Sequence, residues 1–244
     1  MLNVLFADDN MDYIKNVANL IFCKNEKVRL VKIANNVREA IECIKECKID
    51  LVFLDLLMPF GGGWKLLEML EEENYGNKKP KIIVISGDNE LVLKIRDKYD
   101  IQDAISKDCG INNTISRINK NIDDLIKIKN IEEYERRTYE ELINLKYNTK
   151  YKGTKYIIES VIYIMENINN SMLLENLEKN VYPIIACKHQ KSTQNIKGNI
   201  VKATNNMYMD CNLNYLLNYF NYTMDTKPTP KVVISTIVNK LLRK

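Results

Sequence analysis

No stretch of this chain approaches the run of about 20 apolar residues that a helix needs to cross a bilayer. The start of the chain has neither the basic segment nor the small-residue cleavage site of a secretory signal peptide. Six cysteines are spread over 244 residues without the spacing of a disulfide framework, which fits a reducing compartment. We therefore expect a cytoplasmic protein with no membrane partner.

The chain is also poor in groups that would make a catalytic nucleophile and its base. Its single histidine, His189, lies in a predicted turn. It could contact a phosphate there, but the interpretation we favour is a solvated side chain. Cys43 and Cys47 lie one helical turn apart without further ligands nearby in sequence, so we interpret them as packing residues. Apart from the aspartate site described below we find no nucleophile and base, and the sequence does not predict an enzyme.

The charge is small overall, at +4, but it is unevenly distributed. Residues 1–128 contain 19 Lys and Arg against 21 Asp and Glu, whereas residues 137–244 contain 15 against 8. A basic half behind a mildly acidic one indicates nucleic acid or an acidic partner for the second half. The length leaves room for two domains that each bury a core.

The first half alternates short apolar strands with amphipathic helices. The predicted strands are residues 2–7, 28–33, 51–54, 81–86 and 101–106. The predicted helices that follow them are residues 11–22, 37–47, 64–73, 89–96 and 111–128. Five consecutive strand–helix units predict an α/β fold with a five-stranded parallel, doubly wound sheet and helices on both faces.

Polar side chains follow four of these strands. They are Asp8 and Asp9 after the first strand, Asp55 after the third, Ser86 at the end of the fourth and Lys107 after the fifth. Carboxyl ends of parallel strands share one edge of a sheet, so we expect these side chains to meet there. Clustered carboxylates call for a hard divalent cation such as Mg²⁺. One carboxylate can then attack phosphorus, while the hydroxyl and the amine bind the phosphoryl oxygens.

Residues 1–128 resemble a bacterial response-regulator receiver domain. The resemblance lies in the order of these polar residues and in the loop Asp-Leu-Leu-Met-Pro at 55–59, followed by Gly63. It implies that Asp55 is the phospho-acceptor and that a histidine kinase or a phosphotransferase is a partner. The implied Mg²⁺ ligands are Asp8, Asp9, Asp55 and the main-chain carbonyl of Leu57. The implied phosphoryl-binding and switch residues are Ser86 and Lys107.

Two positions depart from the receiver pattern. Asp108 stands where the family has a proline after the lysine, and Ala104 stands where it has a Tyr or Phe that turns inward. Asp108 could pair with Lys107 and adds negative charge beside a phosphoryl group, and Ala104 removes the rotating ring. Two hypotheses stay open: a receiver that is phosphorylated on Asp55, and a degenerate receiver that acts without phosphate.

The joint between the two halves also allows two interpretations. Residues 111–145 contain no Pro or Gly, and apolar residues recur there at three- and four-residue steps. They could form one long helix that joins the halves or pairs with its copy in a dimer. The interpretation we favour is the fifth receiver helix, a charged linker at 129–138 and a new helix. The predicted domains are then 1–128 and 139–244.

The second half shows helical periodicity and no convincing strand. Pro183 is expected to begin a short helix, and a turn at 189–191 with a helix opened by Ser192 would complete a helix-turn-helix. Amides can bind adenine edges, and lysines can bind guanine or phosphate. The candidate DNA contacts on this last helix are Ser192, Gln194, Asn195, Lys197, Asn199 and Lys202. The alternative is an amphipathic helix with a solvated polar face.

Four segments of this half carry a family resemblance: KGTKY at 152–156, VYPIIA at 181–186, FNYT at 220–223 and KPTP at 227–230. In these segments the half is similar to the C-terminal DNA-binding domain of the stage-zero sporulation transcription factor family. The resemblance implies a phosphorylation-controlled, sporulation-related transcription regulator that binds DNA, which we expect to act as a dimer across two half-sites. The family carries arginines on the recognition helix where this chain has Asn195, Gly198 and Val201, so we expect altered or relaxed specificity.

A second hypothesis comes from a different class of function. A degenerate receiver could dock signalling partners while the altered helix no longer selects DNA, which would make the protein a protein-interaction regulator. Salt separates the two hypotheses, because a protein that contacts several phosphates loses affinity for DNA steeply as the salt concentration rises.

Overall fold

A computed structural model describes residues 1–22, 25–72, 79–221 and 227–243 of the chain. The chain divides into two compact units, Met1–Lys127 and Ile128–Lys244. Among the described residues, no helix is long and apolar enough to cross a membrane. The predicted helical end at Glu73 and the last two residues of the FNYT segment lie outside the described residues.

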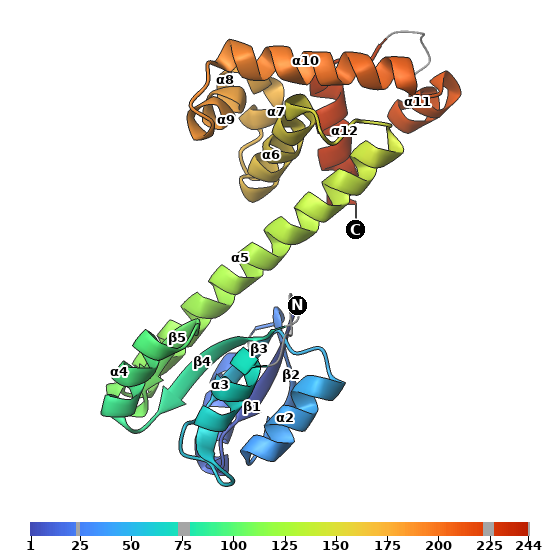
Figure 1. Cartoon of the computed structure of the whole chain (residues 1–244). Coiled ribbons are helices and arrows are strands. Elements are labelled where there is room, and N and C mark those ends of the chain that lie inside the picture. Colours follow the sequence, from blue (N-terminus) through green and yellow to red (C-terminus); the bar gives the residue numbers. More distant parts are fainter. Residues whose placement is uncertain (23–24, 73–78, 222–226, 244) are drawn as a thin grey trace. The chain divides into compact units, whose positions relative to one another are not determined.

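The first unit is built on a five-stranded parallel sheet with the order β2-β1-β3-β4-β5 (Figure 1). Its strands are β1 (Leu2–Ala7), β2 (Val28–Ala34), β3 (Leu51–Leu54), β4 (Lys81–Ser86) and β5 (Asp103–Ser106). The direction of winding reverses between β1 and β3, which is where such sheets place their sites. Ala7 pairs with Leu54, so the residues that follow these two strands, Asp8 and Asp55, leave the sheet side by side.

Helices cover both faces of the sheet, which confirms the predicted doubly wound fold. They are α1 (Met11–Phe22), α2 (Val37–Glu46), α3 (Gly62–Glu72), α4 (Asn89–Lys98) and the first part of α5 (Ile111–Asn144). Side chains of β3 alternate between two buried clusters. Val52 and Leu54 pack with α2, α3 and α4, and Leu51 and Phe53 pack with α1 and α5. A strand buried on both faces needs apolar residues at every position.

The helix α5 runs without interruption from Ile111 to Asn144, so the favoured prediction of a linker at 129–138 between two helices is wrong. The charges that suggested a linker stabilise the helix instead. Arg136 forms ion pairs with Glu133 and Glu140, three and four positions away, and pairs at this spacing stabilise a helix. Pairing of this helix with a copy of itself stays a prediction.

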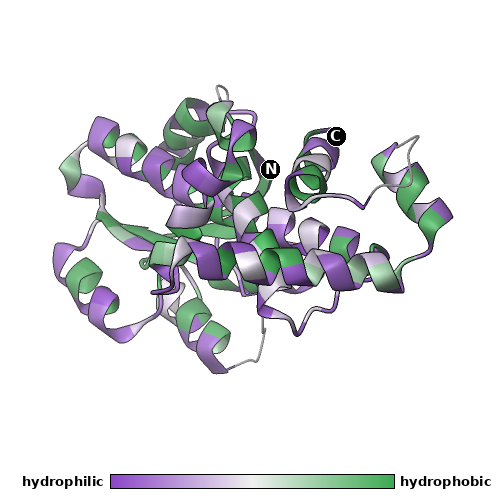
Figure 2. Cartoon of the chain, turned by 90° about the horizontal axis from the view of Figure 1, so that it is seen from above, coloured by the Kyte–Doolittle hydropathy of each residue, from purple (hydrophilic) through white to green (hydrophobic). Residues whose placement is uncertain are grey.

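The described part of the second unit is helical, as predicted. After the end of α5 it contains α6 (Lys152–Glu166), α7 (Met172–Glu175), α8 (Leu177–Asn180), α9 (Tyr182–Lys188), α10 (Thr193–Asp210), α11 (Leu213–Phe220) and α12 (Pro230–Leu242). Green apolar and purple polar residues alternate around the helices (Figure 2). Apolar faces meet in one core that includes Ile157, Ile200 and Ile237.

The predicted helix-turn-helix is formed by α9 and α10. Pro183 lies in the first turn of α9, where its missing N–H costs nothing. The turn passes through Gln190, whose φ is 52°. Ser192 is the N-cap of α10, and its Oγ accepts a hydrogen bond of 3.2 Å from the N–H of Asn195.

Candidate functional site

Asp55 directly follows β3, and only 6% of its surface is exposed. Its N–H donates to Ala7 O at 2.8 Å, which extends the pairing of β3 with β1 by one residue. Its Oδ1 accepts a hydrogen bond of 3.2 Å from the N–H of Leu57. Gly63 packs directly against the backbone of Asp55, since a Cβ at position 63 would lie only 2.3 Å from Asp55 O. Only glycine allows α3 to approach the end of β3 this closely.

Asp8 and Asp9 complete a group of three carboxylates with Asp55. The ligand oxygens of the three residues lie within 4.8 Å of one another. Asp8 is buried and Asp9 is exposed, so the cluster reaches from the sheet edge to the surface. Asp8 Oδ1 accepts a hydrogen bond of 2.9 Å from the N–H of Asn10. Burial raises the pKa of Asp8, and hydrogen bonds from Lys107 and Asn10 offset part of that rise.

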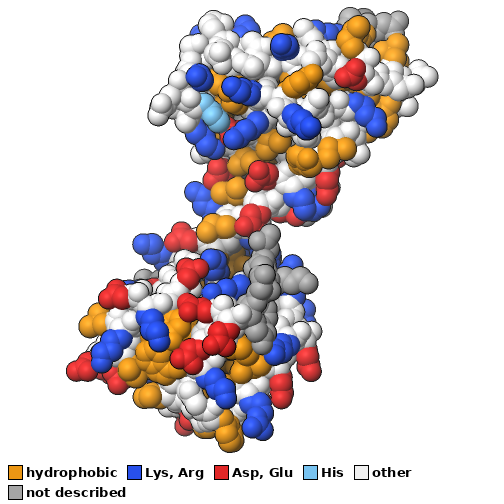
Figure 3. Space-filling view, in the orientation of Figure 1, with side chains coloured by type: hydrophobic (Ala, Val, Ile, Leu, Met, Phe, Trp, Pro, Cys, Tyr) orange, Lys and Arg blue, Asp and Glu red, His pale blue; other side chains and the backbone are white. Residues whose placement is uncertain are grey.

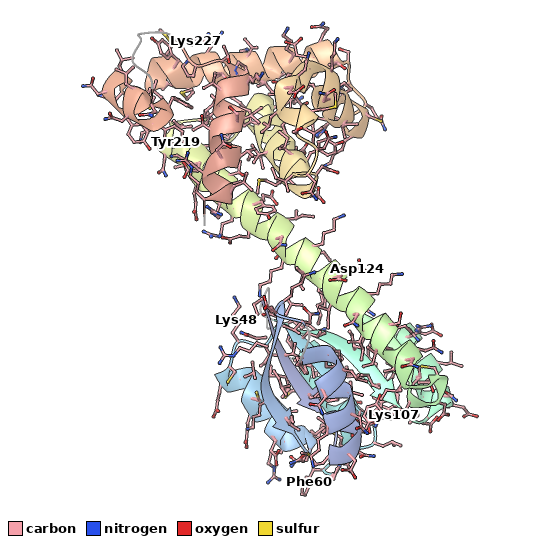
Figure 4. The ribbon with its side chains drawn as sticks, turned by 180° about the vertical axis from the view of Figure 1, so that it is seen from behind. Lys48, Phe60, Lys107, Asp124, Tyr219 and Lys227 are labelled. Carbon is pink, nitrogen blue, oxygen red and sulfur yellow. The ribbon has the colours of Figure 1, made fainter. Side chains whose placement is uncertain are left out.

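Lys107 supplies the positive charge of the site. Its Nζ lies 2.8 Å from Asp8 Oδ2 and 2.7 Å from Asp55 Oδ2, and 4.5 Å from the centre of the Tyr13 ring. Burial lowers the pKa of Lys107, but its hydrogen bonds to Asp55 and Asp8 outweigh burial and raise it overall. The side chain lies at the same end of the sheet as Phe60 and at the opposite end from Lys48 (Figure 4).

Ser86 ends β4 and is fully buried. Its Oγ accepts a hydrogen bond of 3.4 Å from the N–H of Asp88. Asp88 in turn caps α4, because its Oδ1 accepts from the N–H groups of Glu90 and Leu91 at 3.0 Å each. The Ser86 hydroxyl is thus joined to the start of α4 through one residue.

Asp108 does not pair with Lys107, which binds Asp8 and Asp55 instead. Its carboxylate accepts a hydrogen bond of 3.1 Å from Asn89 Nδ2. Its N–H donates to Ser106 Oγ at 3.1 Å. The negative charge of Asp108 is therefore held at the start of α4 rather than in the carboxylate cluster.

A second charged group, absent from the sequence analysis, surrounds Asp103 on β5. Its Oδ1 accepts from Arg96 Nη2 at 3.1 Å and also from Arg117, and its Oδ2 accepts from Asn121 Nδ2 at 2.9 Å. Both arginines also donate to Ala104 O. Burial raises the pKa of Asp103, but the hydrogen bond from Asn121 and the charge of Arg117 outweigh it and lower the pKa overall. In the sequence, only the four-residue spacing of Arg117 and Asn121 indicated this group, because it places both side chains on the same face of a helix.

The carboxylate cluster fits Mg²⁺, because all of its donors are hard oxygens. Asp8, Asp9 and Asp55 would hold the ion. Leu57 exposes its side chain and directs its N–H to Asp55, and its carbonyl stays a predicted ligand.

The six candidate DNA contacts on α10 are not equivalent. Ser192 caps the helix, and Lys197 Nζ lies 2.8 Å from Glu178 Oε1 on α8. Asn199 Nδ2 donates to Asn195 O at 2.8 Å and to Asn195 Oδ1 at 3.2 Å. The remaining candidates are exposed, and they are Gln194, Asn195 and Lys202. The predicted buried face is confirmed and contains Ile196, Ile200, Ala203 and Met207.

The interpretation of His189 as a solvated residue is wrong. Its Nε2 lies 2.6 Å from Glu159 Oε2 on α6, and its ring packs against Tyr156 with centroids 5.0 Å apart. The side chain is 23% exposed. The histidine therefore attaches the turn between α9 and α10 to α6.

Two protein families match the two halves of the chain. The family described as response regulator receiver domain matches residues 4–119, and the one described as sporulation initiation factor Spo0A C terminal matches residues 138–241. A protein-glutamate methylesterase/protein-glutamine glutaminase of Methanospirillum hungatei is 34% identical over 35% of this chain and 24% of its own length. An uncharacterized response regulatory protein of Vibrio parahaemolyticus is 29% identical over 49% of this chain and 48% of its own length. The chain thus spans less than half the length of these relatives.

Solved receiver structures cover the same part of the chain. The receiver domain of a Francisella response regulator is 24% identical, with a TM-score of 0.42, over 51% of this chain and 98% of its own. The receiver domain of AraT from Geobacillus stearothermophilus is 22% identical, with a TM-score of 0.44, over 52% of this chain and 98% of its own. The two family models thus show a response regulator receiver domain followed by a C-terminal domain of the sporulation initiation factor Spo0A family.

Proposed function

We propose that this protein is a phosphorylation-controlled transcription regulator that accepts a phosphoryl group on Asp55 and binds DNA through α9 and α10. The observation that carries the proposal is the ion pair of Lys107 with Asp55 and Asp8 at the carboxyl edge of the sheet. Lys107 Nζ lies 2.7 Å from Asp55 Oδ2, and a carboxylate oriented in this way can act as the nucleophile of a phosphoryl transfer.

The transfer is an in-line displacement at phosphorus. A carboxylate oxygen of Asp55 forms a bond to the phosphorus of a phosphohistidine on a kinase or a phosphotransferase. The bond from phosphorus to the imidazole nitrogen breaks, and its electron pair stays on the donor histidine. Mg²⁺, when bound by Asp8, Asp9 and Asp55, neutralises charge on the phosphoryl oxygens. Lys107 then donates charge-assisted hydrogen bonds to the oxygens of the new group.

The route of the signal out of the site avoids position 104, where Ala104 has no ring to rotate. Ser86 accepts the N–H of Asp88, which caps α4. A Ser86 hydroxyl that turns to donate to the phosphoryl group loses this contact, because its oxygen moves away from the N–H. We expect the first turn of α4 to shift as a result.

The second unit supplies the output. Its helix-turn-helix and its excess of Lys and Arg suit DNA, and two phosphorylated receivers would bring two such units together over adjacent half-sites. The donor, the DNA and the homodimer are parts of the same proposal.

Radiolabelled phosphodonor tests the input end of the proposal. With acetyl phosphate and Mg²⁺, the wild-type protein should incorporate label, and Asp55→Asn should incorporate none. Asp100→Asn is the matched control, because Asp100 is an exposed acid of the same unit, and it should behave like the wild type. Equal labelling of wild type and Asp55→Asn would refute the assignment of the acceptor.

DNA binding measured by fluorescence anisotropy tests the output end. The affinity for genomic fragments should fall steeply as the salt concentration rises, and it should increase when beryllofluoride occupies the receiver. A protein with no salt slope and no sequence preference would instead be a regulator that acts through protein contacts.

A further inference from the structure

Gly198 occupies the middle of α10 without any packing reason. Among the described residues, a Cβ built on Gly198 would meet nothing within 4 Å, and its backbone does not have the positive φ that favours glycine. Gly153 on α6 shows the opposite case, because a Cβ there would lie 2.0 Å from Asn199 O and 2.8 Å from Ala203 Cβ. The fold thus requires glycine at 153, whereas at 198 glycine only weakens the helix relative to alanine.

Gly198 lies at the centre of the solvent-facing side of α10. The buried residues of this helix include Ile196, Ile200 and Ala203, and at 100° per residue position 198 points directly away from them. The neighbours of Gly198 on the same side are Gln194, Asn195 and Lys202, all exposed. The helix backbone at Gly198 is therefore exposed between the side-chain amides of Gln194 and Asn195 and the ammonium group of Lys202.

The amide of Asn195 is held in place by its own helix. Its Oδ1 accepts a hydrogen bond of 3.2 Å from Asn199 Nδ2. Within the described part of the chain, the second lone pair of Oδ1 and both hydrogens of Nδ2 remain for a ligand, and these are the groups that bind N6 and N7 of adenine. Asn199 is thus a positioning residue for Asn195.

Lysines border one side of this surface. A cavity of about 280 Å³ begins at Lys202 and is also lined by Lys150 and Lys152. None of the described residues that line it is acidic, and Lys and Arg side chains are spread over the visible face of this unit (Figure 3). A basic border beside a face of amides suits a duplex whose phosphates lie along the lysines and whose base edges meet the helix.

We infer that α10 selects A·T-rich DNA and that Gly198 is a specificity-determining residue. The missing Cβ leaves room of about one methyl group, so the 5-methyl group of a thymine packs directly against the helix backbone. Gln194 and Asn195 bind adenine edges on either side of it. α10 carries no arginine, so the commonest contact with guanine is missing. This inference rests on the DNA binding proposed above.

The test uses the full-length protein and a library of random duplexes. The wild type should enrich A·T-rich sites. Gly198→Ala should bind the enriched site at least tenfold more weakly, since a methyl group on the helix collides with the thymine methyl, although its melting temperature should rise. Met209→Ala is the control, because Met209 is exposed on the same side of α10 but lies about 16 Å further along the helix; it should bind like the wild type.

Two outcomes overturn the inference and leave the DNA-binding proposal standing. They are equal affinity of Gly198→Ala and wild type for the enriched site, and enrichment of G·C-rich sites by the wild type. A wild type that binds no duplex at any salt concentration overturns the DNA-binding proposal itself, and the inference with it.

Discussion

Lys107 and Asp55 are 52 residues apart in sequence, yet Lys107 Nζ and Asp55 Oδ2 lie 2.7 Å apart. The lysine follows β5 and the acid follows β3, and only the parallel sheet brings them to the same edge. The lysine also binds Asp8, so one ammonium group compensates two buried carboxylates. A phosphoryl group on Asp55 would bind next to this ion pair. A change in the pair should therefore affect both the proposed phosphorylation and the stability of the receiver unit.

Replacing Lys107 with alanine should destabilise the receiver unit by about 3 kcal/mol, because it leaves buried carboxylates without a counter-charge. Urea unfolding measured by the fluorescence of Trp64, the single tryptophan, reports on this unit. Lys48→Ala is the control, since Lys48 lies at the other end of the sheet (Figure 4). A similar loss in both variants would show that the pair with Asp55 is not the cause.

Asp103→Asn should lower the stability of the receiver by about 1–3 kcal/mol near neutral pH, because charge-assisted hydrogen bonds are lost. The pKa of Asp103 is lowered in the folded state. Its contribution is therefore fully present above the pKa of the unfolded chain, about 4, and is lost as the pH falls through the folded pKa. Urea unfolding at neutral and at acidic pH should show the difference from wild type shrinking in acid.

Asp100→Asn is the control for this pH series, because Asp100 is exposed three residues away. It should follow the wild type at every pH. A difference between Asp103→Asn and wild type that stays constant into acid would contradict the depressed pKa.

Gly153→Ala and Gly198→Ala should change the stability of the helical unit in opposite directions. At position 153 the methyl group would meet Asn199 O, which forces α6 and α10 apart at a cost of about 1–3 kcal/mol. At position 198 it meets no described residue within 4 Å, and the gain in helix propensity is up to about 1 kcal/mol. Thermal unfolding followed by far-ultraviolet circular dichroism measures both. Shifts of the same sign would contradict the contact at Gly153.

His189→Ala should destabilise the helical unit by about 1–2 kcal/mol, because it removes the hydrogen bond to Glu159 and the ring contact with Tyr156. The same thermal measurement applies. Lys191→Ala alters an exposed residue of the same turn and should have no effect. An unchanged melting temperature in His189→Ala would contradict this, because it would show that the contacts of His189 with Glu159 and Tyr156 do not stabilise the unit.

Ser86→Ala should separate phosphorylation from its output. Asp55 keeps its ion pair and should still accept label, whereas the gain in DNA affinity with beryllofluoride should disappear, because the contact from Ser86 to the cap of α4 is gone. Anisotropy with and without beryllofluoride measures this gain. Ser116→Ala, an exposed serine on α5, should keep it. A full gain in Ser86→Ala would exclude this route of the signal.

Local patterns predicted most of the fold, because buried positions require apolar residues and these recur at the spacing of a strand or a helix. Leu51 to Leu54 had to be apolar, since β3 is covered on both faces. The buried face of α10 repeats at helical spacing for the same reason. The prediction failed at 129–138, where a run of charged residues was interpreted as a linker. Charged residues are common in solvated linkers, but oppositely charged residues three or four positions apart also stabilise a helix.

The order of strands and helices, and the presence of an acid, a hydroxyl and a lysine at strand ends, were already determined by the amino-acid sequence. The tertiary structure alone decided which charges pair: Lys107 with Asp8 and Asp55, Asp103 with Arg96 and Arg117, and Lys197 with Glu178. Periodicity reports whether a side chain faces the core, but it carries no information about which distant residue faces it. That choice depends on how the strands are ordered and how closely the helices pack.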